Sequence, residues 1–159
     1  MKHLNTYITE YIIKKKLDKP IDSEDHYVYY PETKQELIDN VKELFNKGET
    51  NLNCIDTSKI TDMSRSFESY ENINFDISKW NVSNVKDMTC MFGNCVKFKG
   101  KGLENWNVSK AEYMIRMFIG CDNFTGEQIE NWKIKKDCSK FEMLSNCKNI
   151  KNMPSWYTK

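Results

Sequence analysis

The sequence predicts an α/β repeat solenoid, a stack of about four short helix–strand units that follows a helical N-terminal cap. The first observation is that tryptophan recurs at spacings of 26, 26 and 24 residues, at Trp80, Trp106, Trp132 and Trp156. The second is that other apolar residues keep the same period. A fixed period of this length is typical of repeat proteins, in which each unit buries its apolar face against the next. We therefore expect like side chains of successive units to touch.

The other periodic residues predict further ladders of buried side chains. Methionine stands eight residues after a tryptophan, phenylalanine twelve and cysteine fifteen, and an earlier copy has Ile55 in the tryptophan position. The expected ladder residues are Trp80, Trp106, Trp132, Trp156, Met88, Met114, Phe67, Phe92, Phe118, Cys95, Cys121 and Cys147. Burying one large apolar side chain is worth roughly 1.5–3 kcal/mol, so stacked units can offset a loss of chain entropy that one unit alone cannot.

Within each unit, the spacing of the apolar residues predicts a short helix followed by a short strand. In the second unit these residues step by three, four and three, which places them on one face of a helix. They are Val85, Met88, Phe92 and Cys95. Ser83 or Asn84 is the expected N-cap of this helix. The alternation of Trp106 and Val108 predicts the short buried strand.

The chain divides into three predicted parts. Residues 1–25 form an amphipathic helix and a linker, and residues 26–52 form a strand and a helix that cap the stack. The units occupy residues 53–156, at about 53–79, 80–105, 106–131 and 132–156. We expect the first helix to pack on the cap, and a free helix or a partner-binding helix stays open as the alternative.

Residues 80–95 carry the segment WNVSNVKDMTCMFGNC. This segment resembles the repeat of BspA-like surface proteins, which also occurs in mycoplasma lipoproteins, and the resemblance extends over residues 33–156. It implies a leucine-rich-repeat-like solenoid and a role in adhesion or partner binding, and it brings no catalytic residues. The chain departs from the pattern at residues 110–113 and at Lys140, which replaces the periodic methionine. We expect such departures near a terminal unit whose outer face meets water.

Charge and hydropathy limit the classes of partner. The 24 basic and 23 acidic residues nearly cancel, so we expect no nucleic-acid partner. No run approaches the ~20 apolar residues of a membrane span, and the start of the chain lacks the apolar segment of a secretory signal. We expect a cytoplasmic protein, or one in the host cytoplasm if it is phage-encoded, with a surface or virion location as the alternative.

The cysteines and histidines give no catalytic or metal-binding pattern. Half of the six cysteines occupy one position of the repeat, on the predicted apolar face, so we expect reduced and buried thiols. Cys90 falls off this face and is the candidate for an exposed, reactive thiol. No C-x-x-C spacing occurs, and the only histidines, His3 and His26, lie in no recognisable catalytic motif. We expect no metal, no cofactor and no enzymatic activity.

The function that we expect is that of a non-enzymatic protein-binding module with a rigid repeat surface, including a small phage or bacterial protein that captures a host factor. The variable segments fall at the same place in every unit and should line one edge. The expected contacts on this edge are Asn74, Phe75, Lys99, Lys101, Glu104, Glu127 and Glu130. Two alternatives remain: a surface or virion adhesion element, and a structural protein that self-assembles through the N-terminal helix or a solenoid end. The C-terminal lysines indicate a solvated face, or a docking patch for an acidic partner.

Overall fold

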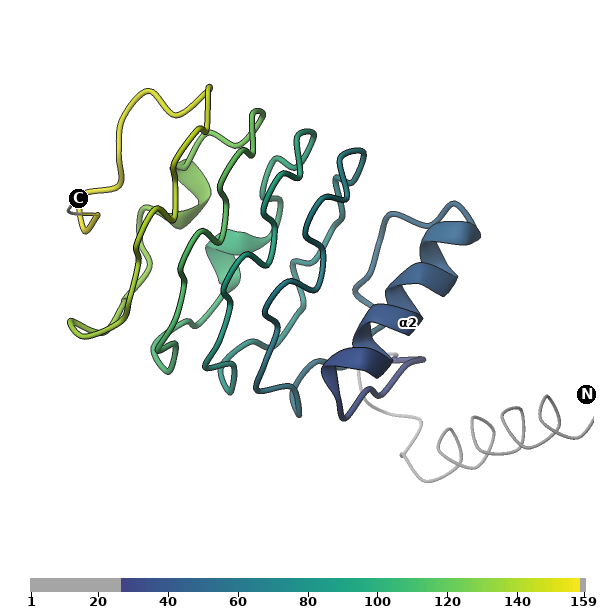
Figure 1. Cartoon of the computed structure of the whole chain (residues 1–159). Helices are drawn as coiled ribbons and strands as arrows, with labels where there is room; N and C mark the ends of the chain where they lie inside the picture. Colours follow the sequence, from purple (N-terminus) through teal and green to yellow (C-terminus); the bar gives the residue numbers. More distant parts are fainter. Residues whose placement is uncertain (1–26, 158–159) are drawn as a thin grey trace, which may run out of the picture.

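The computed structural model describes residues 27–157 of the chain. Successive coils of the chain lie side by side in one row, with helix α2 (Lys34–Asn46) at one end and the C-terminal segment at the other (Figure 1). We number these coils one to four, at about residues 53–79, 80–105, 106–131 and 132–156. The helix and linker predicted for residues 1–25 lie outside the described residues.

The predicted fold class, an α/β repeat solenoid, is wrong, and so is the leucine-rich-repeat-like fold that the resemblance implied. Between residues 27 and 157 the chain forms one α-helix, α2, and two short 3-10 helices, η1 (Leu103–Asn105) and η2 (Glu127–Ile129). Strand pairing in this range is limited to isolated parallel bridges, so there is no sheet. The coils consist of turns where helix–strand units were expected.

The hydrogen bonds of the second coil show why its apolar spacing is not helical. The N–H of Met91 donates to the carbonyl of Met88, three residues back, at 3.1 Å. The N–H of the intervening Cys90 leaves the coil and donates to the carbonyl of Ile115 in the third coil, at 2.9 Å. An α-helix needs every N–H to reach the carbonyl four residues back. Steps of three and four residues here follow successive turns, and Ser83 and Asn84 precede no helix that they could cap.

Left-handed residues recur in these turns and exclude a continuous helix. Each coil has two residues of positive φ near its apolar positions: Arg65, Ser69, Cys90, Asn94, Arg116, Gly120, Glu142 and Asn146. A positive φ at the third residue is the mark of a type II turn, and it costs an L-residue other than glycine about 1–2 kcal/mol. Because Cys90, Arg116 and Glu142 lack the usual turn signal of glycine or asparagine, the sequence did not reveal these turns.

Backbone hydrogen bonds between coils set a parallel register. Along one stretch of each coil, every second N–H donates to the next coil, as Met88 does to Tyr113 at 2.8 Å and Phe92 to Met117 at 2.9 Å. The same positions then repeat, with Met114 donating to Ser139 at 2.8 Å. Parallel bridges link Asp62 to Asp87, Asp87 to Tyr113, and Tyr113 to Ser139. Equivalent residues of neighbouring coils therefore face each other.

Aromatic rings stack between the coils as a result of this register. Trp80 and Trp106 have ring centroids 6.5 Å apart and planes within 6°, and Trp106 and Trp132 repeat this at 6.3 Å and 5°. Phe92 lies 5.7 Å from both Phe67 and Phe118. Each indole N–H also donates to a carbonyl of the preceding coil, at 3.3 Å from Trp106 to Ile77 and 2.7 Å from Trp132 to Leu103. The buried polar atoms of the tryptophans are thus paired, as burial requires.

The periodic cysteines also point to the preceding coil. The thiol of Cys95 donates to the carbonyl of Phe67 at 3.0 Å, and that of Cys121 donates to the carbonyl of Phe92 at 2.9 Å. Burial raises the pKa of the Cys95 thiol to about 12, which removes its nucleophilic thiolate form near neutral pH. Cys90 was predicted to be exposed and reactive, but it is only 5% exposed, and burial raises its pKa as well. That prediction is wrong, because the charged side chains of Arg65, Glu68 and Arg116 on the neighbouring coils surround the thiol.

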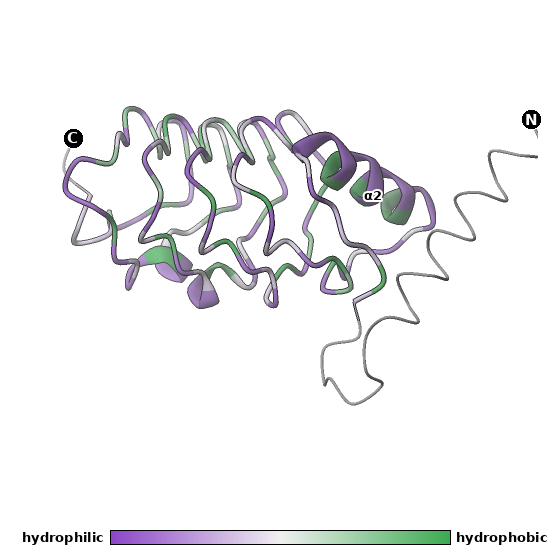
Figure 2. Ribbon diagram, turned by 90° about the horizontal axis from the view of Figure 1, so that it is seen from below, coloured by the Kyte–Doolittle hydropathy of each residue, from purple (hydrophilic) through white to green (hydrophobic). Residues whose placement is uncertain are grey.

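Helix α2 covers the first coil, and its hydrophobic residues lie on the side that faces the coils (Figure 2). Its N-terminus carries a capping box, in which the hydroxyl of Thr33 accepts the N–H of Glu36 and the carboxylate of Glu36 accepts the N–H of Thr33, each at 3.2 Å. Leu37, Val41 and Leu44 are buried against the coils. The strand predicted before this helix is reduced to one bridge, from Tyr29 to Ile55.

Truncating a central ring should destabilise the whole row of coils. We expect Phe92→Ala or Phe118→Ala to lower the free energy of unfolding by about 3–5 kcal/mol, the range for a fully buried aromatic residue. Phe141→Ala is the matched control, because this ring is 63% exposed and should change stability by no more than about 0.5 kcal/mol. Urea denaturation followed by tryptophan fluorescence measures all three. Equal stabilities for the buried and exposed variants would contradict the stacked core.

Candidate functional site

The candidate site lies on the edge that carries the two 3-10 helices. η1 and η2 occupy equivalent places on the second and third coils and lie near each other (Figure 1). Each follows a glycine with positive φ, Gly102 at 95° and Gly126 at 84°. A Cβ on Gly102 would lie 2.4 Å from Cα of Ser78, so only glycine allows the second coil to approach the first this closely.

Four of the seven predicted contacts meet in a hollow of about 400 Å³ on this edge. The second coil contributes Lys99, Lys101 and Glu104, and the third contributes Glu127 together with Gln128, which was not among the predicted contacts. Lys99, Lys101, Glu104 and Glu127 are all exposed. The hollow therefore combines two cationic and two anionic side chains from neighbouring coils.

The other three predicted contacts lie elsewhere. The side-chain oxygen of Asn74 accepts the backbone N–H of Lys99 at 3.1 Å, so Asn74 supports the hollow without lining it. Glu130 accepts the N–H of Ser155 at 3.2 Å and faces the C-terminal segment. Phe75 is only 1% exposed and is wrong as a contact, because its ring packs in the core, 6.1 Å from Phe67.

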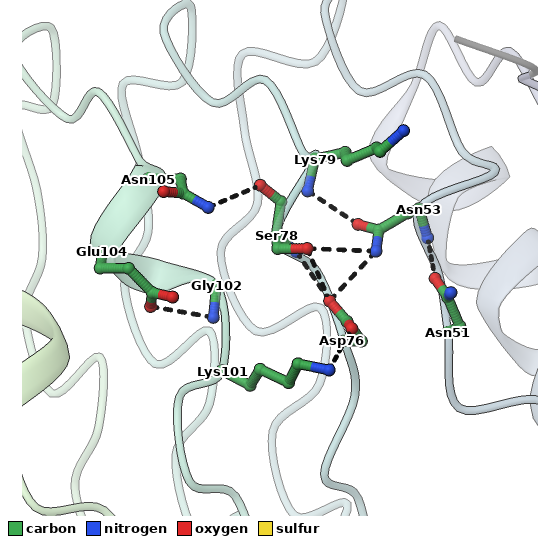
Figure 3. A network of polar contacts seen from close by, with 9 residues as sticks. All are labelled: Asn51, Asn53, Asp76, Ser78, Lys79, Lys101, Gly102, Glu104 and Asn105. Atoms are coloured by element: carbon green, nitrogen blue, oxygen red, sulfur yellow. Dashed lines mark hydrogen bonds and ion pairs between the residues drawn. The ribbon is translucent and has the colours of Figure 1, made fainter. Parts of the chain in front are cut away.

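A polar network on the first coil, beside the hollow, binds Lys101 (Figure 3). Its ammonium group pairs with the carboxylate of Asp76 at 2.5 Å. This carboxylate also accepts hydrogen bonds from the Ser78 hydroxyl at 2.8 Å and the Asn53 side-chain amide at 3.1 Å. Sequence reasoning missed Asn53, Asp76 and Ser78. The spacing Asp76-x-Ser78 was a usable signal, because a carboxylate that accepts an N–H two residues on forms an Asx turn.

The network also determines the protonation state of Asp76. Partial burial by itself would raise the pKa of this carboxyl group, but Lys101 and the hydrogen bonds from Ser78 and Asn53 outweigh it and hold the pKa well below its usual range. The ion pair therefore persists at any pH near neutrality. It anchors one wall of the hollow at a defined place on the backbone.

The arrangement suits recognition of a polar surface. Glu104 is held in turn, because its carboxylate accepts the N–H of Gly102 at 3.0 Å. Opposite charges at fixed positions can match a partner of complementary pattern and disfavour a mismatched one. Over residues 27–157, no group of three or more histidine, cysteine, aspartate or glutamate side chains is placed to hold a metal ion. The helices of the described segment include none that is long and apolar enough to span a membrane.

Most of the chain matches a known protein family. A family model described as "Mycoplasma protein of unknown function, DUF285" matches residues 36–157, which include most of α2 and all four coils. Neither the curated proteins nor the solved structures gave a match.

The ion pair between Lys101 and Asp76 should make the stability of the fold depend on pH at the acid end. Because the folded pKa of Asp76 is depressed, its stabilisation is present above the unfolded pKa of about 3.9 and is lost as pH falls below it. We expect Asp76→Asn to cost about 1 kcal/mol at pH 7, with a deficit that shrinks below about pH 4. Denaturation at pH 7 and below about pH 4 measures this deficit, and Asp137→Asn, at an exposed residue, is the control. A deficit of equal size at both pH values would contradict the assignment.

Proposed function

The chain belongs to the DUF285 family, and we propose that it acts as a non-enzymatic protein-binding module through the edge that carries η1 and η2. The observation that carries this proposal is the hollow shared by two neighbouring coils, in which Lys99, Lys101, Glu104 and Glu127 gather. These residues come from segments that differ between coils, whereas the buried positions beneath them repeat. Such a surface can change its specificity without disturbing the core.

Rigidity supports the same proposal. The backbone under the hollow is held by the tryptophan stack and by buried indole hydrogen bonds, such as Trp106 to Ile77 at 3.3 Å. The side chains above are tethered, Lys101 by Asp76 and Glu104 by Gly102. A surface that is ordered before binding loses little conformational entropy when a partner docks, which leaves more of the interaction energy as affinity.

The compartment and a second candidate function depend on different observations. All six cysteines are free thiols, which supports a reducing compartment such as the cytoplasm. The resemblance of residues 80–95 to BspA-like surface repeats favours the second candidate, adhesion at a cell or virion surface. Protease treatment of intact cells discriminates between them, because a surface protein is digested and an internal one is protected.

The edge should be required for capture of a partner protein. We expect the tagged wild-type chain to retain a specific protein from a lysate of its native host, identified by mass spectrometry. Reversing two charges of the hollow, Lys99→Glu with Glu127→Lys, should reduce the retained amount by at least about tenfold, since like charges placed across an interface repel.

The control is Lys42→Glu, an exposed charge reversal on α2, which should retain the partner as the wild type does. Thermal melts establish that all variants fold. If the partner bound the Lys99→Glu and Glu127→Lys double variant as well as the wild type, the edge at η1 and η2 would not be the binding surface. A lysate that yields no specific protein at all would count against the binding function itself.

A further inference from the structure

The fourth coil is the last of the described coils, and four of its backbone N–H groups have no acceptor in the part of the chain that the structure describes. In the third coil, the corresponding groups donate onward, as Arg116 does to Phe141 and Phe118 to Met143, both at 2.9 Å. In the fourth coil these positions are Lys140, Glu142, Leu144 and Asn146. The hydrogen bonds that join the coils thus stop at the fourth coil, whose edge can still donate N–H groups to an acceptor.

Between residues 139 and 146, the outer side of this edge offers N–H donors and no free carbonyl at the intervening positions. Carbonyls at the intervening positions, such as Phe141 and Met143, already accept N–H groups from the third coil. The carbonyl of Cys138 corresponds to those of Lys86 and Glu112, which accept from the next coil, but here it accepts from the ammonium group of Lys140 at 3.0 Å. A molecule that pairs with this edge must therefore supply acceptors.

A groove of about 700 Å³ runs along the edge between the fourth coil and the C-terminal segment. All four donor residues line it. Its apolar wall includes Phe141, Met153 and Tyr157, and two of these are well exposed, Phe141 at 63% and Met153 at 45%. Large apolar side chains exposed together beside unpaired backbone groups are typical of a surface that another chain covers.

The charge of the fourth coil limits which kind of chain can cover the groove. Residues 132–157 contain six lysines and two acidic residues, Asp137 and Glu142. In the groove, Glu142 pairs with Arg116 and Lys148 pairs with Asp122, each at 2.6 Å, and Lys140 binds a carbonyl. With these pairs formed, the charge that remains among the lining residues is that of Lys140, and the N–H groups add to its positive potential, so an acidic segment is the complementary partner.

A second copy of this chain does not fit the edge. The opposite end of the row is covered by α2, whose Leu37 and Val41 are buried against the first coil. Two C-terminal ends facing each other would oppose donors to donors. An extended peptide, in contrast, presents the carbonyl together with the N–H of every second residue along one side, so its carbonyls can reach donors that alternate along the edge.

We propose that the end of the fourth coil is a docking site for an acidic, extended peptide segment of another protein. Its carbonyls accept the N–H groups of Lys140, Glu142, Leu144 and Asn146, and its apolar side chains pack beside Phe141 and Met153. This site is separate from the hollow at η1 and η2. It binds through backbone hydrogen bonds, whereas the function proposed for the edge at η1 and η2 depends on side chains.

The test uses a short fluorescent peptide of alternating glutamate and valine and the chain of 159 residues. We expect saturable binding by fluorescence anisotropy, with slowed hydrogen exchange at the amides of Glu142 and Leu144 by NMR. Combining Phe141→Ala with Met153→Ala should weaken binding by at least about tenfold, as truncation of central apolar anchors does. Tyr113→Ala, at a residue that is 47% exposed outside the groove, should bind as the wild type does.

Further measurements separate peptide docking at this site from nonspecific binding, nucleic-acid binding and self-association. The variant Lys99→Glu should bind the peptide as the wild type does. The result of this test therefore does not depend on whether the edge at η1 and η2 binds a partner. Equal binding of a lysine–valine peptide, tighter binding of oligothymidine, or unchanged amide exchange in the complex would overturn the proposal. It would also be overturned if no peptide bound, or if sedimentation showed self-association that the Phe141→Ala and Met153→Ala double variant abolished.

Discussion

The hydrogen bonds between coils are the constraint on which the rest of this structure depends. Along one stretch of each coil, two kinds of N–H group alternate. One closes a turn within the coil, as the N–H of Met91 does onto the carbonyl of Met88, and the next crosses to the neighbouring coil, as that of Phe92 does to Met117. This alternation fixes the register, and the register brings identical side chains together. The tryptophan and phenylalanine stacks and the thiols directed at preceding carbonyls follow from it. Hydrophobic burial supplies most of the stabilisation, but the backbone bonds decide which residues are buried together.

The sequence revealed which residues repeat and not how the backbone between them runs. Steps of three and four residues suit a helix and also suit successive turns, and only hydrogen bonding distinguishes the two. Asn94 and Asn146 carried a turn signal, but Cys90 and Arg116 adopt positive φ without one. The helix at 34–46 was predictable, because Thr33 and Glu36 form a capping box ahead of amphipathic residues.

Part of the candidate site was predictable, because the variable segments fall at the same place in every coil. Aligning the variable segments of the coils brought Lys99, Lys101, Glu104 and Glu127 to one edge, where the structure forms the hollow. Phe75 was misplaced because it was assigned to a variable segment by its position in the repeat. It alternates with Ile73 and Ile77, which are buried with it, and this period of two was the signal to follow. Asp76, between them, could not be linked to Lys101 without coordinates, since the pair joins two coils.

The two ends of the row differ, and this difference gives the molecule its direction. Helix α2 closes the first end with apolar side chains, whereas the fourth coil presents backbone donors and replaces the periodic methionine by Lys140, whose ammonium group covers one carbonyl. Amide hydrogen exchange by NMR tests this account most directly. Alternating bonds between coils predict strong protection for the amides of Met88, Cys90, Phe92 and Asn94 and fast exchange at Lys140, Glu142, Leu144 and Asn146 in the free protein. Fast exchange in the second coil, or equal protection at both sets, would contradict it.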